Sequence, residues 1–307
     1  MRIAFFGTPE FAIPSLTALL QSEEEVTVVV TQTDKRKGRS HVSSFSPVKK
    51  FALDRGIKIL QPVYINDPLF IDELSTLMPD IIVVVAYGKI LPTQILRLPR
   101  LGCINVHASL LPKYRGAAPI QWAIMNGEKK TGITAMFMDE RLDTGDILLQ
   151  EEAEIADDDN AETLSKRLAD IGASLLLKTI NGIKGRYIKP IPQMGTPSYA
   201  PPLKKDDGRL DWSKTAIEIF NLVRAMYPWP CAYCYLNEER IKIIKVKVLE
   251  GSGMPRRIEK TGKELIVGTG EGLISLIELQ PEGKRPMPAT AFLQGRRLQK
   301  GAFFDEP

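Results

Sequence analysis

An asparagine and a histidine two positions apart carry the strongest chemical signal in this sequence. Asn105 and His107 lie at the end of the apolar run Cys103–Val106, within the stretch GCINVHASLLPKYRGAAP. Side chains two positions apart on a strand point to the same face of a sheet. An amide can donate to a developing oxyanion, and an imidazole can move a proton near neutral pH. The pair therefore predicts acid/base chemistry, with a histidine that only ends a strand as the alternative.

A loop rich in carboxylates follows a later apolar run. The stretch GITAMFMDERLDTGDIL places four acidic residues between two predicted strands: Asp139, Glu140, Asp143 and Asp146. A carboxylate beside His107 would orient the imidazole and stabilise its cationic form. Asp143 is the best candidate, because the Asp-Thr-Gly sequence that it opens can turn tightly. The alternative, a cation site, lacks a second cluster of ligands in the sequence.

The segment after His107 favours a binding site. Residues 109–116, SLLPKYRG, are largely apolar, contain a proline and are too irregular for a helix. Apolar residues in a loop at a strand end predict the wall of a pocket for a flat ligand. An ordinary connection between elements is the alternative.

The cysteines offer little chemistry. Cys231 and Cys234 form a C-x-x-C pair in a predicted strand, where an offset of three puts side chains on opposite faces. Besides them the chain has Cys103, His41 and His107, so a four-ligand zinc site is hard to assemble. We expect half-buried cysteines, no disulfide framework and no metal, with redox or metal chemistry at the pair as the alternative.

Positive charge is concentrated in two places. The formal net charge is +4; residues 204–307 hold 18 lysines and arginines against 14 acids, whereas residues 1–203 hold 23 of each. The neutral part contains one cationic run: Lys35, Arg36, Lys37 and Arg39. A polyanionic partner that contacts both places explains this distribution, and solvated surface lysines are the alternative.

Alternating strands and helices must position these residues. Seven short runs predict strands: Ile3–Phe6, Val26–Thr31, Ile57–Leu60, Ile81–Val85, Cys103–Val106, Ile133–Met138 and Ile147–Glu151. The predicted helices are Glu10–Leu20, Pro47–Arg55, Pro68–Leu77, Ala118–Met125 and Ala161–Ile180. Runs that are apolar on both faces, such as IIVVVA, are typical of central strands in a parallel sheet. We therefore predict an α/β fold with a doubly wound, mainly parallel, Rossmann-like sheet.

Ligands of such sheets bind beyond the carboxyl ends of the strands, where the polar residues described above lie. The first strand ends in Gly7, Thr8 and Pro9 rather than in a G-x-G-x-x-G fingerprint. Without that fingerprint, the sequence argues against a nicotinamide-dependent enzyme.

A proline-rich stretch divides the chain. Five prolines fall within thirteen residues, too many for a helix or an interior strand: Pro190, Pro192, Pro197, Pro201 and Pro202. We predict a catalytic domain over 1–188, a semi-rigid linker over 189–207 and a small β-rich domain over 208–307. One helix, Lys214–Ala225, and four β runs predict an OB-like barrel in the last part, a fold that commonly binds oligonucleotides: Ala232–Leu236, Ile241–Val248, Glu264–Val267 and Leu273–Leu279.

The sequence predicts no membrane segment. A membrane-spanning helix needs roughly 18 consecutive apolar residues, and the strongest apolar run, Ile81–Ala86, has the length of a strand. The amino-terminal residues MRIAFFGTPE enter a strand without the pattern of a secretory signal. We expect a cytoplasmic protein.

The whole set of motifs resembles the folate-dependent formyltransferases. Their signature is an Asn, a His two residues on, and an Asp in a D-x-G turn, which this chain matches in NVHASLLPKYRGAAPIQWAI and MDERLDTGD. Further segments that resemble the family are FFGTPEFA, TQTDKRKGRS, VVVAYGKILP, YAPPLKKDDGRLDW, YPWPCAYC and LQPEGKRPM. Several of them lie outside the shared catalytic core and indicate the branch that acts on initiator methionyl-tRNA.

The resemblance implies roles for individual residues. The catalytic trio of the family corresponds to Asn105, His107 and Asp143. The implied folate contacts are Leu110, Leu111, Pro112, Lys113, Tyr87 and Gly88. The implied tRNA contacts lie in the loop 34–46 and are Lys35, Arg36, Lys37 and Arg39. The co-substrate is then 10-formyltetrahydrofolate, the folate product is tetrahydrofolate, no metal takes part, and we expect a monomer.

Three other functions remain open on sequence grounds. A formyltransferase that acts on a sugar-nucleotide amine would keep the trio but needs no cationic run at 35–39. A glycinamide ribonucleotide enzyme would need only the first domain. An RNA-binding module with a degenerate α/β domain would not need an intact Asn105, His107 and Asp143.

Overall fold

The computed structural model describes residues 1–37, 42–296 and 298–306. These residues form two compact units. The first comprises residues 1–119, 130–154 and 165–201, and the second comprises residues 120–129, 155–164 and 202–307.

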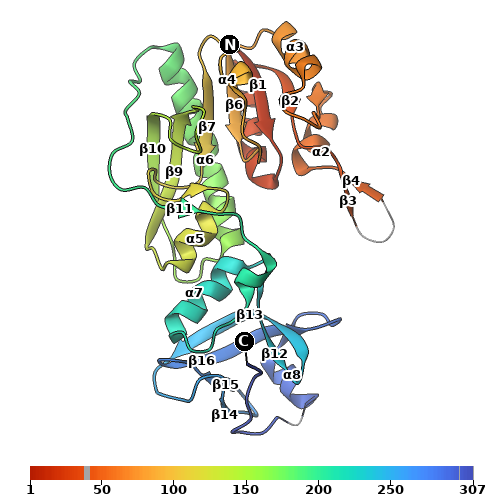
Figure 1. The fold of residues 1–307 in the computed structure, drawn as a ribbon, viewed down its shortest axis with the longest axis vertical. Helices are drawn as coiled ribbons and strands as arrows, with labels where there is room; N and C mark the ends of the chain where they lie inside the picture. Colours follow the sequence, from red (N-terminus) through yellow and green to blue (C-terminus); the bar gives the residue numbers. More distant parts are fainter. Residues whose placement is uncertain (38–41, 297, 307) are drawn as a thin grey trace. The chain divides into compact units, whose positions relative to one another are not determined.

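A seven-stranded sheet organises the first unit, in the order β10-β9-β7-β6-β1-β2-β5 (Figure 1). Its strands are β1 (Arg2–Gly7), β2 (Glu25–Val30), β5 (Ile59–Leu60), β6 (Ile81–Val85), β7 (Cys103–His107), β9 (Lys130–Phe137) and β10 (Ile147–Glu154). The first five run parallel, and β9 is antiparallel to its neighbours β7 and β10. The prediction of a doubly wound, mainly parallel sheet is confirmed.

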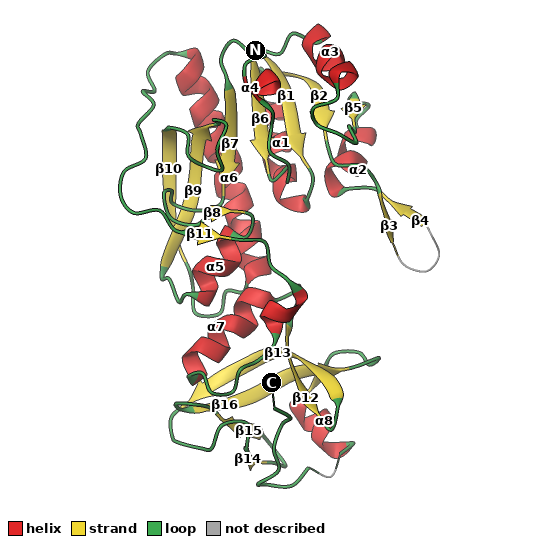
Figure 2. Ribbon diagram, viewed as in Figure 1, coloured by secondary structure: helices red, strands yellow, loops and turns green. Residues whose placement is uncertain are grey.

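Helices alternate with these strands along the chain (Figure 2). They are η1 (Glu10–Ala12), α1 (Ile13–Gln21), α2 (Pro47–Leu53), α3 (Pro68–Thr76), α4 (Thr93–Leu96), α5 (Pro119–Met125) and α6 (Ala161–Lys184). Side-chain caps fix two starts: Lys49 N–H donates to the Ser46 hydroxyl at 3.0 Å, and Leu69 N–H donates to the Asp67 carboxylate at 3.0 Å. The sequence did not predict α4, because four residues are too few to show a helical period.

Burial on both faces explains the apolar strands of this sheet. Every residue of β6 is buried. One core cluster joins β1, β6 and α4 through Phe6, Val84 and Ile95, and it also contains Tyr87 and Cys103. Full burial of one such aliphatic or aromatic side chain stabilises the fold by about 1.5–3 kcal/mol.

Two chain segments of this unit adopt pairings that sequence patterns did not indicate. The first three residues of the cationic run form β3 (Lys35–Lys37), which pairs antiparallel with β4 (Val42–Ser44) in a short hairpin. In the proline-rich stretch, Ile191 exchanges two backbone hydrogen bonds with Ile147 of β10, at 2.8 and 2.9 Å. Further on, β11 (Tyr199–Ala200) pairs in parallel with β8 (Arg115–Gly116). Residues between the prolines keep their N–H groups, so an extended proline-rich segment can still add to a sheet edge.

An antiparallel sheet organises the second unit, in the order β12-β13-β16-β15-β14, with β17 paired to β16. Its elements are η2 (Lys205–Gly208), α7 (Ala216–Met226), β12 (Ala232–Leu236), β13 (Glu239–Leu249), β14 (Ile258–Lys260), β15 (Leu265–Gly268), β16 (Leu273–Pro281), β17 (Met287–Pro288) and α8 (Ala289–Gln294). The sheet curls into a half-barrel around a core that includes Trp212 stacked on Phe304, ring centroids 5.3 Å apart. The predicted OB-like architecture is confirmed.

The three cysteines are buried and unpaired. Cys103 lies in β7 and Cys234 in β12, whereas Cys231 precedes β12 with a positive φ of 68°. The expectation that both cysteines of the C-x-x-C pair belong to one strand was therefore wrong. Cys231 N–H donates to the Met226 carbonyl in the turn that follows α7, so this N–H is not hydrogen-bonded to the neighbouring strand of the sheet.

We expect the folded protein to resist thiol reagents at pH 8. Burial raises the pKa of Cys103 to about 12 and also raises the pKa of Cys231 and Cys234. Because the thiolate is the nucleophile, labelling by Ellman's reagent should reach less than ~0.3 thiol per folded chain within minutes. In denaturant all 3 cysteines should react. Rapid labelling of one native thiol would show a reactive cysteine instead.

Candidate active site

Strand β7 carries the two residues that the sequence singled out. It pairs in parallel with β6, where Val84 faces Asn105, and antiparallel with β9, where Thr134 faces His107. Alternation along the strand places Cys103, Asn105 and His107 on one face. The thiol of Cys103 lies 3.7 Å from the carbonyl oxygens of Ile95 and Leu96, so α4 covers one end of that face.

The imidazole of His107 is buried and held by a main-chain carbonyl. Its Nε2 lies 2.9 Å from the Tyr114 carbonyl oxygen. A carbonyl only accepts, so Nε2 is the nitrogen that carries the proton. The other nitrogen, Nδ1, faces Asp143 Oδ2 at 3.7 Å. That separation is too long for a hydrogen bond, and the contact is electrostatic.

Asp143 reaches this face from the turn between β9 and β10. Its Oδ2 accepts a hydrogen bond from Gly116 N–H at 2.8 Å, and its Oδ1 accepts a longer one from the Asn105 amide at 3.5 Å. The structure therefore brings Asn105, His107 and Asp143 together. Of the two hydrogen bonds to Asp143, the one from the Asn105 amide is the longer and weaker, so this amide can most easily change its partner.

Two glycines make this geometry possible. A Cβ on Gly116 would lie 2.5 Å from the Ala200 carbonyl oxygen, so β8 can approach β11 only with glycine there. A Cβ on Gly145 would lie 1.8 Å from the Phe137 carbonyl oxygen. Asp143 itself adopts a positive φ of 54°. The tight Asp-Thr-Gly turn that the sequence suggested is present, closed by a hydrogen bond from the Thr144 hydroxyl to the Asp139 carboxylate at 2.6 Å.

Internal hydrogen bonds fix the loop after His107. Leu111 N–H donates to the Thr134 hydroxyl at 3.1 Å, and that hydroxyl donates to the Ser109 carbonyl at 2.6 Å. Of the six expected folate contacts, four lie in this loop: Leu111 is buried, Lys113 is exposed, and Leu110 and Pro112 are partly exposed. Leu111 thus supports the loop from within, and its neighbours offer surface for a ligand.

Tyr87 and Gly88 lie beyond the carboxyl end of β6. The Tyr87 side chain is 1 % exposed and packs edge-on against Phe6, with ring centroids 5.2 Å apart. Burial raises the pKa of Tyr87 to about 12. Its carbonyl accepts hydrogen bonds from the Thr8 hydroxyl at 3.2 Å and the Gln32 amide at 2.8 Å. The structure therefore places the Tyr87 ring in the core, and Gly88 offers only main chain at the surface.

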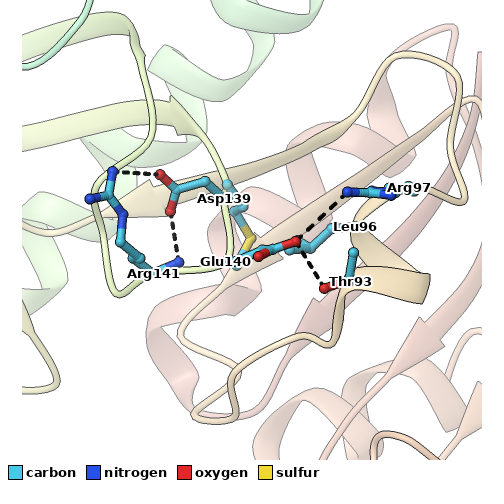
Figure 3. A pocket seen from close by; sticks show the side chains of 7 residues that line it. Thr93, Leu96, Arg97, Asp139, Glu140 and Arg141 are labelled. Atoms are coloured by element: carbon cyan, nitrogen blue, oxygen red, sulfur yellow. Dashed lines mark hydrogen bonds and ion pairs between the residues drawn. The ribbon is translucent and has the colours of Figure 1, made fainter.

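An open hollow of about 490 Å³ lies beside the Asp143 turn (Figure 3). The residues that line it come from α4, from the residue that follows α4 and from the segment after β9: Thr93, Leu96, Arg97, Met138, Asp139, Glu140 and Arg141. The Thr93 hydroxyl donates to Glu140 Oε1 at 3.0 Å, and Arg97 lies 3.9 Å from the same oxygen. The sequence signalled Asp139 and Glu140 through their acidity. It gave no signal for the α4 side, which is more than forty residues away along the chain.

Part of the cationic run lies in the β3–β4 hairpin. Lys35, Arg36 and Lys37 make up β3, whereas Arg39 lies outside the described residues. Asp34 holds the base of the hairpin by accepting hydrogen bonds from Gln61 at 3.0 Å and from Lys49 at 2.6 Å. These two hydrogen bonds lower the pKa of the Asp34 carboxyl, which keeps the anchor ionised.

A basic face lies on the second unit. It consists of four cations of β13: Arg240, Lys242, Lys245 and Lys247. Buried residues alternate with these cations along the strand. A bulge around Lys245, where the pairing with β16 is irregular, shifts this alternation by one residue. The cations before and after the bulge therefore all point away from the core. The Arg240 guanidinium lies 3.7 Å from the centroid of the Tyr233 ring. Cations next to aromatic rings are typical of surfaces that bind nucleic acid.

The described part of the chain contains neither a cluster of metal-binding side chains nor a helix that could span a membrane. Residues 1–37, 42–296 and 298–306 contain no group of three or more side chains that could hold a metal ion. Within the same ranges, no helix combines the length and apolarity needed to cross a membrane.

Comparison with known proteins agrees with this geometry. A family model described as formyl transferase matches residues 1–180, and one described as formyl transferase, C-terminal domain, matches residues 202–297. A methionyl-tRNA formyltransferase of Thermodesulfovibrio yellowstonii is 56% identical over 299 residues, 97% of each chain. A solved sugar 3N-formyl transferase has a TM-score of 0.68 at 23% identity, covering 93% of this chain and 99% of that one. A methionyl-tRNA formyltransferase from Clostridium thermocellum has a TM-score of 0.58 at 19% identity, with 80% and 93% covered.

Proposed function

The chain belongs to the formyl transferase family, and from this membership we propose how its residues act on their substrates. It transfers a formyl group from 10-formyltetrahydrofolate to the α-amino group of initiator methionyl-tRNA, for translation initiation. The observation that carries the assignment of the site is the convergence of Asn105, His107 and Asp143 on one face of β7.

Asn105 stabilises the negative charge that develops on the formyl oxygen. When the neutral amine attacks the formyl carbon, a C–N bond forms and the carbonyl oxygen gains charge. The Asn105 amide makes only a 3.5 Å contact to Asp143, so it can turn its N–H toward that oxygen. One such donor typically contributes about 3 kcal/mol, or two to three orders of magnitude in rate.

His107 moves the proton that the reaction must relocate. Its Nδ1 takes the proton from the attacking nitrogen and passes it to N10 of the folate as the C–N10 bond breaks. Nε2–H remains bonded to the Tyr114 carbonyl throughout, which holds the ring in one orientation. Asp143, 3.7 Å from Nδ1, stabilises the transient imidazolium. Free α-amines titrate near pH 8, so a useful fraction of the acceptor is neutral at physiological pH.

The hollow beside the Asp143 turn fits the folate ring system. Ligand pockets for molecules of this size have volumes of roughly 300–1,000 Å³, and a flat heterocycle with amide-like edges needs donors and acceptors on its rim. Here Glu140 and Thr93 offer both, and Leu96 and Met138 offer apolar walls. We assign the ring to this hollow, with Gly88 and the loop of Leu110, Pro112 and Lys113 toward the rest of the ligand. Folate supplies the formyl group as a co-substrate.

The nucleic acid contacts divide between the two parts of the chain. Residues 1–188 carry the catalytic trio, and residues 208–307 bind the tRNA backbone through the basic face of β13. The run Lys35, Arg36, Lys37 and Arg39 contacts the acceptor end near the reacting amine. We propose that the enzyme works as a monomer in the cytoplasm.

An assay with three acceptors in parallel tests this function. Purified protein and 10-formyltetrahydrofolate are offered charged initiator tRNA, charged elongator methionyl-tRNA and a sugar-nucleotide amine. We expect formylation of the initiator tRNA at a kcat/KM at least ~100-fold above the other two, a range that binding discrimination can supply. A preference for the sugar-nucleotide amine would contradict the proposed acceptor.

Neutralising the basic face should weaken tRNA binding in a salt-dependent way. For the variant Lys245→Gln/Lys247→Gln we expect a KM for tRNA raised about tenfold and a slope of log affinity against log salt reduced by about two, because each phosphate contact releases counterions. The kcat at saturating tRNA should not change. The control is Lys260→Gln, since Lys260, the last residue of β14, already pairs at 2.6 Å with Glu264, which precedes β15. Equal effects of both variants would mean that β13 holds no phosphate.

A further inference from the structure

The side chain of Gln193, in the proline-rich stretch, brackets the turn that carries Asp143. Its Nε2 donates to the carbonyl oxygens of Asp143 and Gly145, both at 2.9 Å. Its Oε1 accepts from the Arg115 guanidinium, from Nε at 3.2 Å and from Nη2 at 2.7 Å. Each polar atom of the Gln193 amide is therefore committed to the geometry of the site.

These contacts close a ring around Asp143. Gly116 N–H donates to the carboxylate of Asp143. The preceding residue, Arg115, donates to the Gln193 side chain, which in turn donates to the main-chain carbonyl of Asp143. Asp143 adopts a φ of 54°, a conformation that residues other than glycine rarely adopt. Such a conformation persists when surrounding contacts fix it, and the ring supplies these contacts on both sides of the residue.

The same stretch also holds the loop that orients His107. Tyr114 N–H donates to the Ser198 hydroxyl at 2.9 Å, and Arg115 N–H donates to the Ser198 carbonyl at 2.9 Å. Ile191 fixes the other end of the stretch on Ile147 of β10. Gln193 therefore lies between two residues that are fixed by hydrogen bonds: Ile191, which pairs with β10, and Ser198, which holds the loop of Tyr114.

We propose that Gln193 is a positioning residue for formyl transfer, which sets the place of the Asp143 carboxylate relative to His107 Nδ1. It touches Asp143 and Gly145 only through their main chain, so it acts through the carboxylate and not on the substrate. The inference rests on the proposed function, because the positioned groups are the ones that we assign to the reaction.

The two variants Gln193→Ala and Gln193→Glu test this role. The first removes the four hydrogen bonds described above, whereas the second keeps an acceptor for Arg115 and sets a carboxylate against two carbonyl oxygens. Because a displacement of about 1 Å at a reacting group can cost a hundredfold in rate, we expect kcat to fall about 10- to 100-fold in both. The KM values for folate and tRNA should change less than about threefold, since neither substrate contact is removed.

A double-mutant cycle with Asp143→Asn separates positioning from general damage to the fold. If Gln193 acts through the Asp143 carboxylate, Gln193→Ala should lower kcat less than about threefold once that charge is already gone. An equal factor in both backgrounds, or a raised KM with unchanged kcat, would overturn the proposal for Gln193 while leaving the proposed function in place. An unchanged kcat in Asp143→Asn alone would overturn the assigned site itself and with it this proposal.

Gln280→Ala is the matched control. Its Nε2 also donates to a main-chain carbonyl, that of Lys284 at 2.8 Å, on an exposed turn of the second unit. We expect kcat in this variant to equal that of the wild type. A loss similar to that of Gln193→Ala would show that removing any such hydrogen bond lowers activity, and would overturn the positioning role.

Discussion

Replacing His107 with alanine should lower kcat for formyl transfer by about three orders of magnitude, the usual contribution of a well-placed general acid and base. The imidazole is the group that relocates the proton from the amine to N10, and the Asp143 carboxylate faces its Nδ1 at 3.7 Å. The measurement is single-turnover formylation of charged initiator tRNA at saturating folate. The KM for tRNA should stay within about threefold of the wild type, because His107 is buried at the donor site.

A second variant guards against loss of the fold, because His107 is 6 % exposed and its removal breaks the buried hydrogen bond to the Tyr114 carbonyl. The loss of one buried hydrogen bond typically costs about 0.5–1.5 kcal/mol of stability. His107→Gln offers an amide N–H to that carbonyl, so it should fold with a Tm closer to the wild type and remain as inactive as His107→Ala. Near-normal turnover in either folded variant would rule out the assigned role of His107.

Asp143→Asn is expected to lower kcat by two to three orders of magnitude with little change in shape. The carboxylate faces Nδ1 at 3.7 Å and favours the imidazolium that forms during proton transfer. The oxygen that faces Nδ1 is the one that accepts from Gly116 N–H, so an asparagine that keeps its amide oxygen there preserves that hydrogen bond and removes the negative charge opposite Nδ1. Stopped-flow or quench-flow measurement of the chemical step separates this effect from substrate binding.

Stability provides the control for this variant. Since the main chain of the turn is held by Gln193 and by the hydrogen bond between Thr144 and Asp139, we expect the Tm of Asp143→Asn to lie within a few degrees of the wild type. A normal rate of the chemical step would show that the charge of Asp143 takes no part. A large drop in Tm would show that the carboxylate mainly stabilises the fold.

The local patterns of the sequence determined the framework and the identity of the central side chains. A period of two placed Asn105 and His107 on one face of a strand, and the Asp-Thr-Gly sequence marked the turn of Asp143. The runs that are apolar on both faces gave the parallel sheet, and the proline-rich stretch marked the change of architecture. Each of these signals depends only on residues that are close together in the sequence, so it can be recognised before the three-dimensional fold is known.

Contacts between distant segments were decided only by the tertiary structure. The carbonyl that orients His107 belongs to Tyr114 because the loop folds back on its strand, and the Asp143 turn meets Gln193 from a segment 50 residues further on. The hollow arises where α4 meets the segment 138–141, and the Tyr87 ring fills the core rather than a ligand pocket. Periodicity and propensity describe which face a side chain takes, but not which distant carbonyl or guanidinium meets it. That choice follows from how the whole chain satisfies its buried polar groups at once.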